Sequence, residues 1–195
     1  MTQSYFDGKA DIWDEKIAEK DTDKLKNMAN NLDIKPGSHV LDVGTGTGIF
    51  VPFLLKKVGN KGKLVCLDSA EKMLEKAREK KFKGNIEYFC SDITSTKFED
   101  EVFDAVVCYS SFPHFRDKPK ALREIKRLLK KGGKLFICHT SSRSAINEIH
   151  QHVAELCTDL IPDQEEMWNL LSSAGFREIK LYDEASSYFA KAEKL

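Results

Sequence analysis

The chain has 195 residues, 41% of them hydrophobic, a length that suits one α/β domain over residues 1–195 better than two domains. Lysine plus arginine and aspartate plus glutamate both total 31, so the net charge of +0 favours neither nucleic acid nor an anionic membrane as partner. The first nine residues are polar, and no stretch approaches the roughly 20 apolar residues of a membrane span. We therefore expect a soluble, cytoplasmic protein with a small-molecule partner, and make no prediction of its oligomeric state.

The cysteines show no C-x-x-C spacing, and three of them lie within apolar runs. This pattern indicates neither a zinc site nor a disulfide framework. We expect buried cysteines that act as small hydrophobic side chains in a reducing compartment. The five residues are Cys66, Cys90, Cys108, Cys138 and Cys157.

At the N-terminus, a helix is predicted around residues 11–30, accompanied by the aromatic residues Tyr5, Phe6 and Trp13. Residues 1–30 would then form a helical lid over a ligand. Aromatic rings there can cover a cofactor and attract a positively charged sulfur, but ordinary packing of an N-terminal helix accounts for them equally well.

Residues 39–48 are the most informative segment, because an apolar, β-branched strand leads directly into a glycine turn and a helix. Gly44 and Gly46 permit positive φ angles and let a ligand lie against the backbone. Asp42 places a carboxylate just before the turn. A phosphate would gain little from that charge, whereas a cationic ligand would be attracted to it.

Helices and strands alternate along the rest of the chain. A helix is expected after the turn until residues 59–62, and Ser69 is expected to cap the next helix. The apolar runs at residues 105–108 and 135–138 fit strands that are covered on both faces. We therefore predict an α/β fold with a doubly wound, mostly parallel sheet and helices on both faces. Strands are expected at residues 63–67, 86–90, 103–109, 134–139, 177–182 and 187–192, and further helices at residues 118–130 and from 162 to 175.

The four residues between the last two strands are enough for a hairpin but too few for a parallel crossover. The last strand should therefore run antiparallel.

Polar side chains follow the strands at their carboxyl ends, where a doubly wound sheet binds its ligand. Asp68 lies 20 residues beyond Gly48, the spacing of an acidic residue that accepts hydrogen bonds from ribose hydroxyls, although it could simply cap a helix. Asp92 is placed to accept from an exocyclic amine such as adenine N6, or is an ordinary loop aspartate. Tyr109, Ser110 and His139 end the next two strands.

The glycines follow the pattern G-x-G-x-G, so that Ile49 stands where a dinucleotide fingerprint has its third glycine or alanine. No lysine follows the glycines before Lys56, which excludes a phosphate-binding loop of the G-x-x-x-x-G-K-[ST] type. Dinucleotides and nucleoside triphosphates are both disfavoured.

In combination, these segments resemble the class I S-adenosylmethionine-dependent methyltransferases over almost the whole chain, from about residue 5 to residue 195. The likeness is to the small-molecule branch, similar to the ubiquinone and menaquinone biosynthesis methyltransferases. Residues 40–48 look like the family's first motif, 67–74 its ribose-binding segment, 90–93 its adenine-binding segment, and 103–107 and 128–135 its signatures around the fourth and fifth strands.

The resemblance implies a Rossmann-like seven-stranded sheet and S-adenosyl-L-methionine as cofactor. Residues 109–113, Tyr-Ser-Ser-Phe-Pro, depart from the Asn/Asp/Ser-Pro-Pro-aromatic motif of amino-methylating enzymes, so a nucleobase acceptor is not expected. Carried over by position, Asp42, Gly44, Thr45, Gly46 and Gly48 would hold the methionine end, Asp68 and Ser69 the ribose, and Met73, Asp92 and Ile93 the adenine, while Tyr109 and Ser110 would lie near the methyl group.

Methyl transfer from a sulfonium is an in-line displacement with a good leaving group, so alignment supplies most of the acceleration and no protein nucleophile is needed. An acceptor that arrives as a hydroxyl, a thiol or an acidic C–H needs a base. His114 and His139, with Tyr109 beside the methyl group, are the candidate catalytic residues. Either histidine could instead be a loop residue bonded to backbone.

Residues 141–161 form an insertion on the acceptor side. Its two histidines, His150 and His152, would point to opposite sides of a helix, so no metal site is predicted and one of them should face the pocket. Two alternatives stay open: an NAD(P)-dependent Rossmann oxidoreductase, which the position of Gly48 disfavours, and a non-catalytic S-adenosylmethionine-binding regulatory module.

Overall fold

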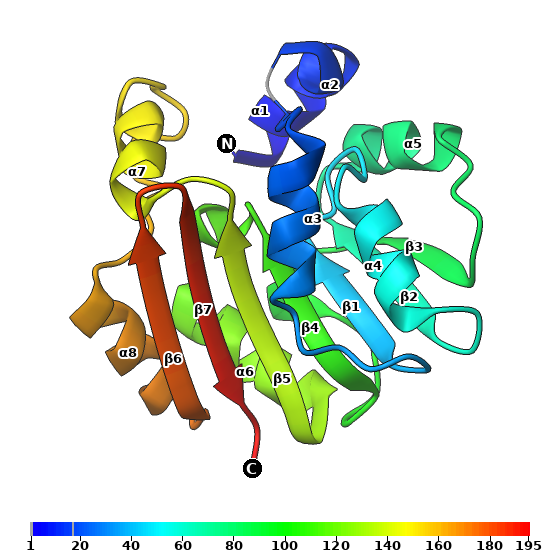
Figure 1. The fold of residues 1–195 in the computed structure, drawn as a ribbon. Coiled ribbons are helices and arrows are strands. Elements are labelled where there is room, and N and C mark those ends of the chain that lie inside the picture. Colours follow the sequence, from blue (N-terminus) through cyan, green and yellow to red (C-terminus); the bar gives the residue numbers. More distant parts are fainter. Residues whose placement is uncertain (1, 17) are drawn as a thin grey trace.

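The computed structural model describes residues 2–16 and 18–195. Its centre is a seven-stranded sheet in the order β3-β2-β1-β4-β5-β7-β6 (Figure 1). The first five strands run parallel, and β7 runs antiparallel to both β5 and β6, as the short terminal connection predicted. The strands are β1 (His39–Val43), β2 (Lys63–Asp68), β3 (Ile86–Cys90), β4 (Phe103–Tyr109), β5 (Leu129–His139), β6 (Arg177–Glu184) and β7 (Ser187–Glu193).

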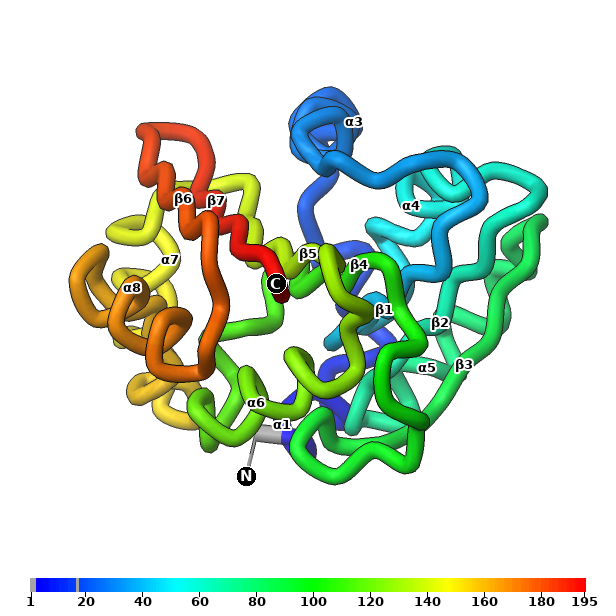
Figure 2. The backbone as a smooth tube through the Cα atoms, turned by 90° about the horizontal axis from the view of Figure 1, so that it is seen from below, coloured from blue at the N-terminus to red at the C-terminus, as the bar shows by residue number. Residues whose placement is uncertain are grey.

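Helices cover both faces of the sheet, α3 and α4 on one face and α6 and α8 on the other (Figures 1 and 2). Within the described residues, no helix has the length and apolar character needed to cross a membrane. The helices are α1 (Thr2–Lys9), α2 (Trp13–Lys16), α3 (Thr22–Asn30), α4 (Val51–Val58), α5 (Glu71–Glu79), α6 (Lys118–Leu128), α7 (Arg143–Gln151) and α8 (Gln164–Ser173), with 3-10 turns at Ala10–Ile12, Ile93–Ser95 and Phe112–His114.

Alternate residues of the central strands pack into two separate hydrophobic cores. Val40 of β1 and its neighbours face α3 and α4, whereas Leu41 and its register partners Val65 and Val106 face α6 and α8. Because a strand in this position is buried on both faces, its sequence is apolar without alternation. This arrangement fixes the register and sets the carboxyl ends of β1, β2, β4 and β5 along one edge.

Three local expectations need correction. The predicted helix at residues 11–30 is broken into α2 and α3, because Asp21 starts a new helix by accepting the backbone N–H groups of residues 23 and 24. Ser69 does not cap α5; the N-cap is Ala70, whose N–H donates to Asp68 at 2.9 Å. Strand β5 starts at Leu129, so the following glycine pair lies inside the strand.

The five cysteines are free thiols, but not all of them are buried. Cys66, Cys108 and Cys138 lie in the sheet with no exposed surface, whereas Cys90 and Cys157 are exposed. The prediction of a buried hydrophobic role is thus confirmed for the three that lie within central strands and wrong for the other two.

Candidate active site

A cavity of about 660 Å³ lies at the carboxyl ends of β1, β2, β4 and β5. Figure 1 shows α1, α2 and α7 above this edge of the sheet. We call one part of its wall the glycine end, made of residues 44–47, Asp68, Ser69, Met73, Asp92 and Ile93. We call the other part the histidine end, made of His114, His139, His150, Ile146, Ile149, Val153 and Leu156.

The glycine turn is bound to the neighbouring strand through its backbone. The N–H groups of Gly44 and Thr45 donate to the carbonyl of Leu67 at 2.7 and 3.1 Å. Gly44 has φ +74°, and a Cβ placed on it would stand 2.3 Å from the Cβ of Ser111. Gly46 has φ +56°, and a Cβ there would meet nothing within 4 Å, so this backbone is open to the cavity. The turn therefore offers a ligand bare backbone, as its sequence predicted.

Asp68 joins the turn to the start of α5. One carboxylate oxygen accepts the N–H of Gly46 at 2.8 Å and the other accepts the N–H of Ala70 at 2.9 Å. Burial raises the pKa of Asp68 above its usual value, against the lowering effect of these hydrogen bonds. Each oxygen retains a further lone pair, so the carboxylate can still accept from a ligand's hydroxyl groups.

Asp42 and Gly48 do not line the cavity, contrary to the expectation of direct contact. Asp42 is only 2% exposed and accepts a hydrogen bond from the Thr45 hydroxyl at 2.9 Å. Burial raises its pKa to about 7, so it does not present a full carboxylate charge to a cation. Gly48 serves packing, since a Cβ there would stand 2.8 Å from the ring of Phe82. Both residues support the turn from the side that faces away from the cavity.

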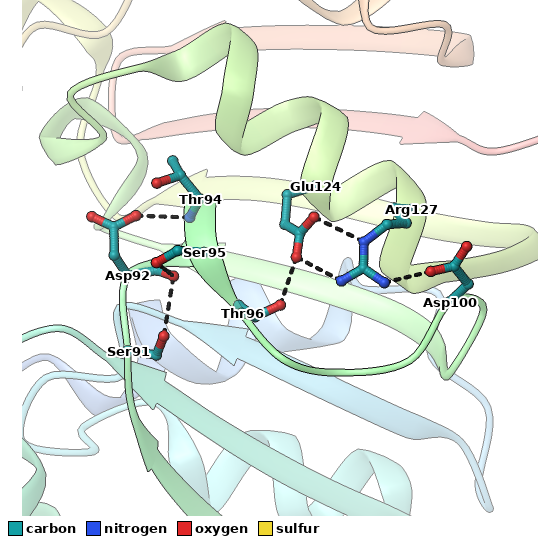
Figure 3. A network of polar contacts seen from close by, with 8 residues as sticks. All are labelled: Ser91, Asp92, Thr94, Ser95, Thr96, Asp100, Glu124 and Arg127. Carbon is teal, nitrogen blue, oxygen red and sulfur yellow. Dashed lines mark hydrogen bonds and ion pairs between the residues drawn. The ribbon is translucent and has the colours of Figure 1, made fainter.

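Two further predicted residues of the glycine end, Met73 and Asp92, come from different segments. Met73 projects from α5 and is buried in a small cluster with Ala70. Asp92 caps the 3-10 turn after β3 by accepting the N–H of Thr94 at 2.7 Å, while its second oxygen points away from that turn (Figure 3).

Further along the chain, the segment that carries Asp92 is bound to α6 by side-chain contacts. The hydroxyl of Thr96 donates to Glu124 at 2.6 Å, and Glu124 also pairs with Arg127, which reaches Asp100 (Figure 3). This network holds the loop after β3 against α6, a few residues beyond Asp92 and Ile93.

Tyr109 and Ser110 line the cavity at the end of β4. The ring of Tyr109 stacks on Phe50 with centroids 4.3 Å apart, and its hydroxyl pairs with Thr140 at 3.1 Å. Burial raises the pKa of Tyr109 to about 12, so the phenol stays protonated at neutral pH and does not suit the role of a base. Ser110 is exposed and has φ +52°, a conformation that non-glycine residues rarely adopt and that often marks a functional site.

Three histidines from different segments meet at the histidine end. Nδ1 of His114 pairs with a carboxylate oxygen of Asp159 at 2.9 Å, and the ring of His150 lies 4.9 Å from that of His114. His150 lines the cavity and His152 is exposed, in agreement with the expected division between pocket and solvent.

His139 is 3% exposed, and its Nε2 has no hydrogen-bond partner among the described residues. Burial, reinforced by the nearby His114 and His150, lowers the pKa of His139 to about 3. It is therefore neutral at physiological pH and a much weaker base than an exposed histidine. We expected His139 as a candidate base; its environment instead makes it a neutral polar residue of the cavity wall.

The N-terminal aromatic residues Tyr5, Phe6 and Trp13 line the same cavity. The ring of Phe6 meets that of His114 edge-on at 4.9 Å and that of Trp13 at 5.4 Å. The segment is also tied to α5, because Asp11 pairs with Lys76 at 2.9 Å and Asp14 with Lys80 at 2.6 Å.

Two residues of the site were missed from the sequence. Ser111 packs on Gly44 and donates its hydroxyl to the carbonyl of Val43 at 2.5 Å. Its side chain leaves no room for a Cβ at position 44, which explains why the turn needs glycine there. Asp159 stands 45 positions from the histidine that it contacts. No local pattern marks either residue, because each depends on segments that only the fold brings together.

The chain is similar to known methyltransferases in sequence and in fold. A family model described as a methyltransferase domain matches residues 41–137. The ubiquinone/menaquinone biosynthesis C-methyltransferase UbiE of Cronobacter sakazakii is 28% identical over 77% of this chain and 70% of its own length. The counterpart in Idiomarina loihiensis is 27% identical over 75% of this chain and 69% of its own.

Solved structures share the fold across the whole chain. A SAM-dependent methyltransferase from Aquifex aeolicus matches with a TM-score of 0.77 and 24% identity, over 99% of this chain and 98% of its own. Phosphoethanolamine N-methyltransferase 2 from Haemonchus contortus, in complex with S-adenosylhomocysteine, matches with a TM-score of 0.76 and 17% identity, over 99% of this chain and 57% of its own.

Proposed function

Because the chain belongs to the class I S-adenosylmethionine-dependent methyltransferases, we propose that the glycine end binds S-adenosylmethionine and that the histidine end receives a small-molecule methyl acceptor. This membership removes the alternative of an NAD(P)-dependent oxidoreductase. The proposal concerns which residues bind the cofactor and which bind the acceptor. Its main support is the contact between the Gly46 N–H and Asp68 at 2.8 Å, which brings a bare backbone turn and a carboxylate to one cavity wall.

The residues of the glycine end fit the cofactor. A cavity of about 660 Å³ lies within the usual size of small-molecule sites, about 300–1,000 Å³. Asp68 has free lone pairs for the ribose hydroxyls, and the second oxygen of Asp92 is placed for the adenine amine. Met73 lies against the same wall for the adenine ring. Gly44 and Gly46 leave room for the methionine end, with Thr45 between them.

When bound, the cofactor supplies a methyl group on a sulfonium sulfur, which is already a good leaving group. The protein's task is then to hold the acceptor in line with that methyl group and to exclude water. The apolar side chains of α7 and the aromatic residues of the N-terminal segment suit both requirements. We propose that residues 1–30 act as a lid, that residues 141–161 form the acceptor wall, and that the whole chain works as one domain.

Calorimetry with S-adenosylmethionine, S-adenosylhomocysteine and NAD tests the assignment, followed by a screen of methyl acceptors that includes carbon acids. We expect both sulfur compounds to bind and NAD not to bind. Tight binding of NAD without a response to the other two would overturn the proposal. Binding without turnover of any acceptor would favour the non-catalytic module. We also propose a cytoplasmic location, which the free exposed thiols of Cys90 and Cys157 support.

A further inference from the structure

The histidine end contains three imidazoles that differ in their hydrogen-bond partners. His114 faces a carboxylate oxygen of Asp159 at 2.9 Å, whereas Nδ1 of His150 faces the backbone carbonyl of the same residue at 2.5 Å. Nε2 of His139 has no partner in the part of the chain that the structure describes. A single residue, Asp159, therefore contacts two of the rings with two different groups.

These contacts fix which ring nitrogen carries the proton. A carboxylate and a carbonyl only accept hydrogen bonds, so Nδ1 is the donor in His114 and in His150. In both neutral rings Nε2 then carries the lone pair. Of these two rings, His114 is the one bonded to the Asp159 carboxylate itself, so a proton accepted at its Nε2 would complete an ion pair with Asp159, whereas His150 is bonded to the backbone carbonyl.

The other two histidines are kept neutral. Burial lowers the pKa of His150 against the raising effect of its hydrogen bond to Asp159 and of the Asp159 charge, and His114 lowers it further. Burial lowers the pKa of His139 to about 3. Lys118 also lies on this side, where its Nζ donates to the carbonyls of residues 113 and 115 and so holds the turn that carries His114. Arg116 and Asp117 complete the charged lining on that side.

We propose that His114 is the general base of the methyl transfer and that Asp159 is the positioning residue that gives it this role. The inference rests on the proposed function of the cavity. The acceptor's nucleophilic atom loses its proton to Nε2 of His114 and bonds to the methyl carbon as the carbon–sulfur bond breaks and its electron pair stays on sulfur. His150 and His139 form a neutral polar wall beside the reacting atoms.

This assignment restricts the acceptor. It must carry an ionisable O–H or S–H, or an acidic C–H, because a neutral amine needs no base before it attacks. Apart from the histidines, the histidine end is lined by the apolar side chains of Ile146, Ile149, Val153 and Leu156. Phe6 covers the ring of His114 edge-on. We therefore infer a largely apolar, ring-sized acceptor whose acidic group points at His114.

A chromogenic phenol tests the base whatever the natural acceptor is. The protein is saturated with S-adenosylhomocysteine, whose binding is checked by calorimetry, and 4-nitrophenol is added at a pH at which the free probe is protonated. The phenolate absorbance then reports proton transfer in the bound state. We expect the native protein to ionise the bound probe, and His114→Gln and Asp159→Asn to lower the phenolate fraction at least about tenfold.

Matched controls separate this effect from a general loss of structure. His152→Gln removes an exposed histidine of the same segment, and Glu184→Gln removes an exposed carboxylate outside the cavity wall; both should ionise the probe like the native protein. Asp159→Glu should restore much of the ionisation, because it keeps the carboxylate, and it keeps the test valid if Asp159→Asn folds poorly.

If S-adenosylhomocysteine binds but the probe does not bind, binds without ionising, or ionises equally in His114→Gln, this inference is overturned and the proposed function stands. If S-adenosylhomocysteine itself does not bind, the proposed function fails first. With S-adenosylmethionine in its place, the rate of methyl transfer to the probe should follow the phenolate fraction across the variants.

Discussion

At the glycine end, the turns after β1 and β2 are held together by backbone N–H groups: those of Gly44 and Thr45 donate to the Leu67 carbonyl, and that of Gly46 donates to the Asp68 carboxylate. At the histidine end, side chains from the N-terminal segment, from the turn after β4 and from the insertion after β5 meet instead. A turn fixed by backbone hydrogen bonds suits a cofactor that stays the same, whereas side chains on inserted segments are free to vary with the acceptor. Changes at the two ends should therefore have separable effects, on cofactor affinity and on acceptor chemistry.

The largest effect is expected from Gly44→Ala. The new Cβ would stand 2.3 Å from Ser111 in a residue at φ +74°, so the turn has to move. We expect affinity for S-adenosylhomocysteine to fall at least about 100-fold, a loss of nearly 3 kcal/mol, as measured by calorimetry. Gly37→Ala is the matched control, because it has φ +89° and open space around it; if both variants lose affinity equally, the explanation by the Ser111 contact is wrong.

A smaller effect is expected from Asp68→Asn. The substitution removes the charge that would accept from both ribose hydroxyls, and hydrogen bonds to charged groups contribute about 1.5–3 kcal/mol, or roughly 10- to 100-fold in affinity. Asp92→Asn should cost only about threefold, because Asp92 is exposed and its hydrogen bond is screened. A larger loss for Asp92 than for Asp68 would contradict the assignment of the ribose to Asp68.

Deletion of residues 1–14 should weaken cofactor binding about tenfold, because it removes Phe6 and Trp13 from the cavity wall. The effect should be a faster dissociation rate in stopped-flow fluorescence or calorimetric competition. Trp168→Ala, which removes a half-exposed aromatic side chain away from the cavity, should leave affinity unchanged. Undiminished affinity in the truncated protein would count against the lid.

The buried carboxyl group of Asp42 should make stability depend on pH. Its native pKa is about 7 and its ordinary value 3.8, so between these values the folded state binds more protons than the unfolded state. The free energy of unfolding should therefore fall as pH rises from about 4 to 7, by about 1.4 kcal/mol for each unit of difference. In Asp42→Asn, urea unfolding at each pH should show a flatter profile; an unchanged profile would refute the assignment of this dependence to Asp42.

The glycine end could be predicted from the sequence because its residues follow their strands directly, and strand ends are marked by local patterns. The antiparallel terminal hairpin was predictable for a similar reason, since its short connection is a local feature. The sequence could not show that Asp42 and Gly48 stand behind the turn, since their exposure depends on Thr45 and on Phe82, a residue beyond α5.

The histidine end was harder to predict because its contacts are long-range. His114 and His139 were both candidates, and only their environments distinguish them. A carboxylate lies 2.9 Å from His114, whereas His139 is buried and its Nε2 has no partner within the described residues. Asp159 lies in an irregular segment with no periodic pattern, so nothing in its neighbourhood pointed to a role. The break between α2 and α3 was missed because Asp21 resembles any other polar residue in a charged stretch.

A crystal structure of the protein with bound S-adenosylhomocysteine tests the division of the cavity most directly. We predict that the ribose hydroxyls lie within hydrogen-bond distance of Asp68, the amino acid part beside Gly44 and Gly46, and the sulfur on the side that faces His114. Adenine or ribose seated among His114, His139 and His150 would contradict the division into a cofactor-binding glycine end and an acceptor-binding histidine end.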